Sequence, residues 1–153
     1  MTIQISSPAF SEGNPISKKY SCDAEDLSPP LAWSGIPAGA KSLALIADDP
    51  DAPDGTWVHW VLFNIPATLT SLPEGVKKSP TVENIGTQGK NGFGKAGYGG
   101  PCPPKGKSHR YFFKLYALDT ALNLQAGASK ADLEKAMQGH ILAQGQLMCT
   151  YGR

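Results

Sequence analysis

The side chains with the most versatile chemistry fall into three short stretches. The stretch ADDPDAPDG, from Ala47 to Gly55, contains four aspartates and two prolines. His59 follows in WVHW, and His109 opens HRY, which also contains Tyr111. Imidazoles change charge near neutral pH, and neighbouring carboxylates orient them or bind cations. These residue types suit general acid–base chemistry, metal ligation or the binding of a small charged ligand.

Strand alternation indicates which of these side chains can meet. In the run 109–118, His109 and Tyr111 share one face and precede apolar residues on that face. In the run 56–65, Trp57 and His59 likewise share one face and precede the apolar residues Val61 and Phe63 on that face. If the two strand ends meet, they form a polar pocket at the mouth of the hydrophobic core.

The acidic loop leads directly into the strand of His59. Asp49 and Asp51 share a face if this loop is extended, and Pro53 restricts its backbone. We expect both carboxylates at the pocket mouth, where they orient histidine N–H groups or bind an amine. They should raise the pKa of the pocket histidines, and they would repel a bare phosphate unless a histidine is protonated or an aspartate is neutral.

A glycine- and proline-rich loop, YGGPCPPKG (98–106), precedes His109. Proline fixes the backbone and lacks an N–H donor, whereas glycine allows a ligand to approach the main chain closely. We therefore expect Cys102 and Pro103 to belong to a rigid pocket wall. The N–H groups of Gly100 or Cys102 could point at an anion.

The elements that must position these residues are mainly strands. Runs rich in β-branched and aromatic residues predict strands over 2–7, 30–35, 42–48, 56–65, 109–118 and 145–152. One helix is predicted over 128–145, with Ser129 as N-cap, Asp132 completing a capping box and Gly145 at its end. His140 is expected to pack on or beside the apolar stripe of this helix. The pattern indicates a mainly β, antiparallel domain with one late helix.

Length and composition set further limits. The 153 residues, 41% of them hydrophobic, suffice for one domain, 1–153, with its own core. A formal net charge of +1 provides no overall field for nucleic acid, and the apolar runs are too short to span a membrane. The start MTIQISSPAF lacks the basic and apolar regions of a signal peptide, so we expect a cytoplasmic protein.

The cysteines are Cys22, Cys102 and Cys149, an odd number without metal-type spacing. For a cytoplasmic chain we expect three free thiols. A bridge between Cys22 and Cys102 stays open as the alternative, because both lie in loops rich in proline or glycine.

Two stretches resemble known ligand-binding motifs but lack the surrounding residues that those motifs require. GFGKAG (92–97) has dinucleotide-loop spacing, but Pro101, Pro103 and Pro104 prevent a helix from opening after it. DPDAPDG (49–55) lacks the later ligands of a calcium loop. The sequence therefore predicts no cofactor and no dedicated metal site.

Taken together, these stretches resemble the phosphatidylethanolamine-binding protein family. The signature regions are DPDAP (49–53), WVHW (57–60) and PPKGKSHRY (103–111), while EDLSPPLAW (25–33) and YGGPCPPKG are similar to its bacterial and archaeal Raf-kinase-inhibitor-like branch. The resemblance implies a two-sheet antiparallel β-sandwich whose small pocket binds phosphate-type anions such as phospholipid head groups. The positions that it carries over are Asp49, Asp51, Pro53, His59, Pro103, His109 and Tyr111.

The resemblance also implies a cis peptide bond at Ala52–Pro53. The chain departs from the eukaryotic pattern in three places. Its loop after DPDAP is very short, Cys102 stands where that pattern has glycine, and no additional helix follows GQLMCTYGR. These departures predict a more open pocket and give no support for kinase binding.

The leading hypothesis is a non-enzymatic binding module for a small anionic or zwitterionic ligand, coupled to regulation or inhibition of a protein partner such as a kinase or protease. The alternative is a hydrolase or metal-dependent enzyme that uses Asp49, His59 and His109, for instance with a 2-His-1-carboxylate metal. Whether the domain forms a homodimer is left open by the sequence.

Overall fold

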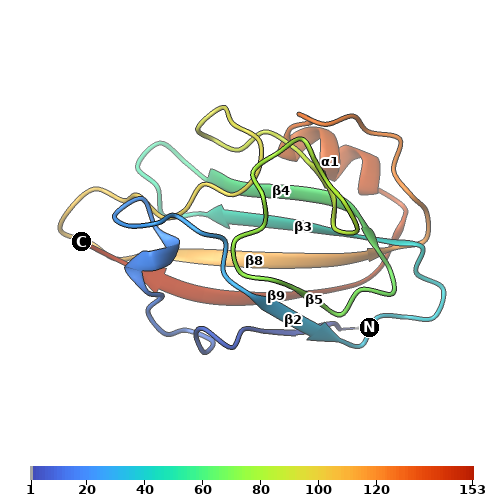
Figure 1. Cartoon of the computed structure of the whole chain (residues 1–153), viewed down its shortest axis with the longest axis horizontal. Helices are drawn as coiled ribbons and strands as arrows, with labels where there is room; N and C mark the ends of the chain where they lie inside the picture. Colours follow the sequence, from blue (N-terminus) through green and yellow to red (C-terminus); the bar gives the residue numbers. More distant parts are fainter. Residues whose placement is uncertain (1) are drawn as a thin grey trace.

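The computed structural model, which describes residues 2–153, contains two antiparallel sheets and one α-helix (Figure 1). The larger sheet has the strand order β6-β7-β4-β3-β8-β9, and the smaller has the order β1-β2-β5. The elements are β1 Gln4–Ser6, η1 (a 3-10 helix) Lys18–Tyr20, β2 Leu31–Ser34, β3 Ser42–Asp49, β4 Trp57–Pro66, β5 Ser71–Leu72, β6 Thr81–Val82, β7 Gly86–Gln88, β8 His109–Leu118, α1 Lys130–Met137 and β9 Ile141–Tyr151. The predicted mainly β, two-sheet architecture with one helix is confirmed.

Apolar side chains form one cluster on each face of the larger sheet. The main core lies between the two sheets and includes Trp33, Leu45, Trp60, Leu62 and Phe113. The second cluster lies under α1 and includes Ile46, Val61, Phe63, Leu133 and Met137. Because β3 is covered on both faces, its sequence is a continuous apolar run instead of an alternating one. Within residues 2–153, no helix has the length and apolar composition needed to cross a bilayer.

The helix is shorter than the predicted segment 128–145. Its start is confirmed, because Ser129 Oγ accepts from the N–H of Asp132 at 3.0 Å and Asp132 Oδ2 accepts from the N–H of Ser129 at 3.1 Å. The helix ends at Met137, and Gly139 follows with a φ of +81°. Residues 141–144 also fit a strand, and pairing with β8 makes them part of β9.

The packing role predicted for His140 is therefore wrong. Its ring lies outside the helix and is exposed, with Nδ1 2.7 Å from Oδ1 of Asp119. The apolar face of α1 instead comes from residues within its short helical span, and Leu133 and Met137 are its buried members.

A β-bulge in β4 turns His59 toward the main core. Ala47 of β3 lies opposite Trp60, whereas the next residue, Asp48, lies opposite Val58, so His59 is an extra residue in β4. The predicted face that joined His59 to Val61 is consequently wrong. Val61 contacts the cluster under α1, while His59 lies beside Tyr111 on the other side of the sheet.

The N-terminal segment crosses the edge strand β9 at Gly145. The N–H of Ile3 donates to the carbonyl of Gln144 at 3.0 Å, and a Cβ atom at Gly145 would collide with the carbonyl oxygen of Ile3. Gly145 is thus required by the close approach of two backbones.

Gly145→Ala should destabilise the protein by about 1–3 kcal/mol, because the overlap forces residues 2–5 away from β9. Urea unfolding measures this loss, and hydrogen exchange at the Ile3 amide should accelerate. Gly39→Ala is the matched control. Its Cβ would meet only the side chain of Leu142, at 3.9 Å, so we expect a change within about 0.5 kcal/mol. Equal effects of the two substitutions would contradict the proposed overlap.

Candidate functional site

A pocket of about 200 Å³ opens at the end of the larger sheet where β3 ends and β4 and β8 begin, at the left in Figure 1. It is formed by the end of β3 with the β3–β4 loop, the start of β4, the loop that carries Phe93, the proline-rich segment before β8, and the start of β8. The lining residues are Asp49, Ala52, Pro53, Asp54, Trp57, His59, Phe93, Cys102, Pro103, Pro104, His109 and Tyr111. Of the predicted site residues, Asp51 alone does not contribute to this lining.

Asp49 and His109 form a buried pair in the pocket wall. Oδ2 of Asp49 lies 2.7 Å from Nδ1 of His109, and the two side chains are 4% and 6% exposed. The other oxygen of Asp49 accepts from the N–H of Asp51 at 2.7 Å. Because a carboxylate only accepts, Nδ1 of His109 carries the proton, which leaves Nε2 for a ligand. Nε2 accepts in the neutral ring and donates in the imidazolium form.

Asp51 lies outside the pocket because it binds Arg110. Its carboxylate accepts from the backbone N–H of Arg110 at 2.9 Å and from the guanidinium at 2.9 and 3.0 Å. The guanidinium lowers the pKa of Asp51 to about 2. Asp51 therefore does not lie at the pocket mouth as expected. Its carboxylate instead attaches the β3–β4 loop to the first residues of β8.

The expected cis peptide at Ala52–Pro53 is also wrong, since no peptide bond within residues 2–153 is cis. The N–H of Gly55 donates to the carbonyl of Ala52 at 3.2 Å, which closes a four-residue turn. Pro53 is the second residue of this turn, where a trans proline has the favoured φ, whereas a cis proline belongs at the third position. The turn therefore contains a trans peptide bond between Ala52 and Pro53.

His59 is joined to the glycine- and proline-rich segment by two hydrogen bonds. Its backbone carbonyl accepts from the N–H of Gly99 at 2.9 Å, and its Nδ1 donates to the carbonyl of Gly99 at 2.6 Å. Burial lowers the pKa of His59 and outweighs the hydrogen bond to Gly99 and the nearby carboxylates. The predicted rise of this pKa is wrong for His59, which is a neutral ring with Nδ1 protonated.

Tyr111 lies beside both histidine rings. Its ring centroid is 5.2 Å from that of His59 and 6.4 Å from that of His109. The hydroxyl is buried and finds no hydrogen-bond partner among the described residues. Burial raises the pKa of this phenol well above its usual value, so the group is a neutral donor. An unpartnered hydroxyl here is a feature that a bound molecule would satisfy.

Aromatic and proline side chains make the remaining walls. Trp57 and Phe93 meet edge to face, with ring centroids 5.4 Å apart, and both are partly exposed at 38% and 44%. Phe93 is a pocket residue that the sequence pattern does not reveal, because its motif GFGKAG, once excluded as a dinucleotide loop, indicates only a glycine loop. An aromatic residue between glycines was the available signal, since Gly92 leaves the space that Trp57 occupies.

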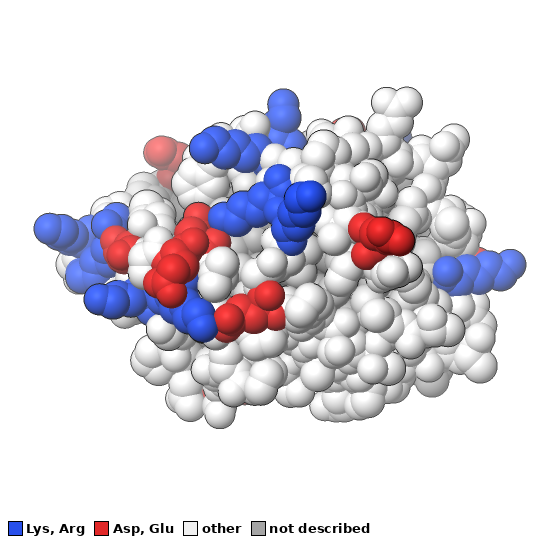
Figure 2. Space-filling model, in the orientation of Figure 1, with Lys and Arg blue, Asp and Glu red and all other residues white. Residues whose placement is uncertain are grey.

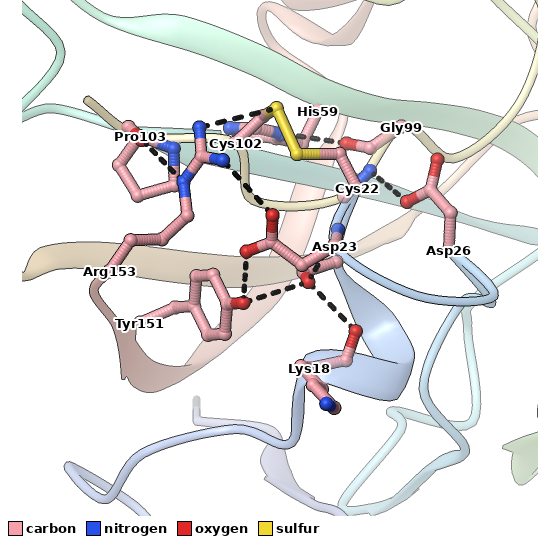
Figure 3. The surroundings of a disulfide bond; sticks show 12 residues. Lys18, Cys22, Asp23, Asp26, His59, Gly99, Cys102, Pro103, Tyr151 and Arg153 are labelled. Carbon is pink, nitrogen blue, oxygen red and sulfur yellow. Dashed lines mark hydrogen bonds and ion pairs between the residues drawn. A yellow bond between two sulfur atoms is a disulfide. The ribbon is translucent and has the colours of Figure 1, made fainter. Parts of the chain in front are cut away.

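Cys22 and Cys102 form a disulfide, which corrects the expectation of three free thiols (Figure 3). The two loops already meet without it, because the N–H of Cys22 donates to the carbonyl of Pro101 at 3.1 Å. Their Cα atoms lie 5.4 Å apart, within the range that a disulfide spans. Cys149 is free and buried in β9.

Charged side chains of both signs intermingle toward the left of the face drawn in Figure 2, which is the end where the pocket lies, and separate positive and negative side chains occur over the rest of that face. This mixture agrees with the net charge of +1. Within residues 2–153, no three His, Cys, Asp or Glu side chains come together as a metal site.

Comparison with known proteins gives concordant results. The sequence profile of the family described as "Phosphatidylethanolamine-binding protein" matches residues 6–152. The chain belongs to the phosphatidylethanolamine-binding protein family. It is 51% identical to a "UPF0098 protein" of Methanothermobacter thermautotrophicus over 151 residues, which cover 99% of each chain.

Solved structures of this family have the same fold. A phosphatidylethanolamine-binding protein homologue from Chlamydia trachomatis superposes with a TM-score of 0.90 at 45% identity, covering 99% of this chain and 98% of that one. Escherichia coli YbcL, described as a member of the mammalian family, superposes with a TM-score of 0.92 at 36% identity, covering 100% and 99%. Within this family fold, the pocket is formed by chain segments that all lie inside the matched region.

The depressed pKa of His59 predicts a loss of stability in acid. Protonation favours the unfolded chain, so this contribution is complete above the ordinary histidine value of about 6.5 and is lost as the pH falls below it. His59→Gln keeps a donor for the Gly99 carbonyl but does not titrate. Between about pH 6.5 and 5, the wild type should lose stability relative to this variant by at most about 1.4 kcal/mol per pH unit. Urea unfolding across this range measures the difference, and a pH-independent difference would contradict the assignment.

Proposed function

We propose that this protein binds a small phosphate-type anion, or a zwitterion with a phosphate group, in the pocket between β4 and β8. The observation that carries the proposal is the buried Asp49–His109 pair, with Nδ1 and Oδ2 2.7 Å apart. Asp49 compensates the positive charge that His109 acquires on protonation, which makes an imidazolium tolerable in a buried wall. Nε2 of that imidazolium then offers a charged donor to an anionic oxygen.

Two neighbouring groups support an oxygen-rich ligand beside His109. The unpartnered hydroxyl of Tyr111 is a second candidate donor. The neutral ring of His59 has Nδ1 engaged with Gly99, so its Nε2 is an acceptor for a protonated phosphate oxygen or a ligand hydroxyl. A phosphate monoanion carries both kinds of oxygen and matches this mixed set of partners.

The outer part of the pocket favours a ligand with a cationic end. Asp54 lines the pocket together with Trp57 and Phe93, and all three side chains are exposed. An ammonium group interacts favourably with carboxylates and with aromatic faces. A phosphate bound at His109 and an amine near Asp54 would place a zwitterionic head group across the pocket.

The enzymatic alternative also rests on the Asp49–His109 pair, because many enzymes use a carboxylate to orient the histidine that acts as their general base. Such a base requires a nucleophile within hydrogen-bond reach. The described lining contains no serine or threonine, and the sulfur of its one cysteine is in the disulfide, so a base here would have to act on water or on a hydroxyl of the ligand. The arrangement therefore supports binding more strongly than nucleophilic catalysis.

Sulfate or phosphorylethanolamine should bind wild-type protein at mildly acidic pH, and His109→Gln should weaken binding about ten-fold or more. The reason is the loss of a charge-assisted hydrogen bond, which contributes about 1.5–3 kcal/mol. Isothermal titration calorimetry measures both affinities. His140→Gln is the matched control, because His140 forms the same kind of 2.7 Å pair with Asp119 on the exposed surface.

If His109→Gln folds poorly, NMR of the wild type decides the question. Titration with sulfate should shift the ring signals of His109 and Tyr111 and leave those of His140 unchanged. Equal shifts at all three rings, or an affinity that His109→Gln leaves unaltered, would refute the proposed site.

Tyr111→Phe should affect stability and binding in opposite directions. Removing a buried hydroxyl that has no protein partner should leave the unfolding free energy unchanged or raise it by about 1 kcal/mol. Losing a neutral hydrogen bond to the ligand should weaken sulfate binding about two- to ten-fold. Thermal unfolding and calorimetry test the pair of effects. A variant that is less stable and binds sulfate normally would assign the hydroxyl a structural role.

A further inference from the structure

The disulfide lies in the wall of the pocket. Cys102 lines the pocket itself, and Cys22 lines an adjoining depression that shares Phe93 with it. The two cysteines are 80 residues apart in the sequence, and both are exposed. An accessible sulfur–sulfur bond at this position can exchange with external thiols, and any movement of Cys102 changes the shape of the pocket.

The two sides of the bond are anchored differently. On the Cys22 side, the carboxylate of Asp23 accepts from Tyr151 and from Arg153, and Ser21 Oγ is 3.1 Å from the hydroxyl of Tyr151 (Figure 3). These contacts connect the loop firmly to the end of β9. Reduction of the disulfide would leave all of them in place.

The Cys102 side is held mainly through backbone groups on either side of the cysteine. Gly99 and Gly100 are held by His59 and by Asp26, which accepts from the N–H of Gly100 at 2.8 Å. The carbonyl of Pro101 accepts from the N–H of Cys22 at 3.1 Å, and the carbonyl of Pro103 accepts from Nε of Arg153 at 2.9 Å. Further along, the N–H of Gly106 donates to the carbonyl of Arg153 at 3.0 Å. Prolines cannot donate a backbone hydrogen bond to replace the lost bond. Cys102 thus lies between two hydrogen-bonded carbonyls, and the disulfide adds the covalent attachment of the exposed side chain at the centre of segment 102–104.

The surroundings also favour reactivity at Cys102. Nη2 of Arg153 lies 3.9 Å from its sulfur, and a nearby guanidinium stabilises a thiolate, which is the nucleophile in disulfide exchange. Cys149 is the opposite case. Burial raises the pKa of its thiol to about 12, so it should not take part in exchange in the folded protein.

We propose that the Cys22–Cys102 disulfide is a redox-controlled site that sets the affinity of the pocket for phosphate-type anions. A dithiol reductant transfers two electrons and two protons to the bond. Its own two thiols become a disulfide, and Cys22 and Cys102 become free thiols. Without this covalent attachment, segment 102–104 closes the wall beside His109 less firmly, and the anion binds less tightly. This inference rests on the anion site proposed above.

The test compares sulfate binding by the oxidised protein with binding after treatment with dithiothreitol and removal of the reagent. Reduction should weaken sulfate binding at least five-fold, and reoxidation with glutathione disulfide should restore it. Maleimide labelling of the folded protein should rise from no labelled thiols when oxidised to labelling at Cys22 and Cys102 when reduced. Cys149 should react only after denaturation.

Two variants make the result specific. Cys22→Ser with Cys102→Ser should bind sulfate as the reduced wild type does and should not respond to reductant, whereas Cys149→Ala should keep the full response. Oxidised protein that binds sulfate with an affinity unchanged by reduction would overturn the redox proposal alone. Oxidised protein that binds no sulfate would overturn the anion site as well. Resistance of the native bond to dithiothreitol would also refute the redox proposal.

Discussion

The site depends on one extra residue in β4. The bulge opposite Ala47 and Asp48 places both His59 and Trp60 on the face that meets the main core. In a regular strand, alternation from Trp60 would direct His59 into the cluster beneath α1, away from Tyr111. Bulges commonly occur beside functional sites because they redirect a side chain without changing the rest of the sheet. Here the redirected imidazole also binds Gly99 and so positions the start of the proline-rich wall.

The acidic loop completes the same arrangement from the other side. Its carboxylates bind consecutive residues of β8, Asp49 to His109 and Asp51 to Arg110. One of these pairs is buried and the other is outside the pocket, so a single loop both attaches itself to β8 and supplies a counter-charge for a pocket histidine. Burying a histidine that can become charged is acceptable only with such a partner. These two pairings account for Asp49 and Asp51, and Asp48 in turn pairs with Lys114 and Lys130 on the other face of the sheet.

The sequence predicts the long strands more accurately than it predicts the helix limits and the short strands. The runs that became β3, β4 and β8 were rich in β-branched and aromatic residues, and their limits were predicted to within about a residue. The helix was predicted too long because residues 141–144 fit both periodicities, and pairing with β8 decided between them. Strands β5, β6 and β7 were missed because segments of two or three residues carry no measurable period.

The sequence by itself determined the two-sheet architecture and the family, and every predicted site residue except Asp51 does line the pocket. Only the tertiary structure decided that His59 leaves its regular face, that Asp51 binds Arg110 outside the pocket, and that Cys22 and Cys102 are joined. Local periodicity predicts how a strand alternates, but it contains no information about the partner strand that creates a bulge. The deciding contacts join residues far apart in the chain, 60 positions for Asp49 and His109 and 80 for the two cysteines, and such contacts exist only once the sheet has assembled.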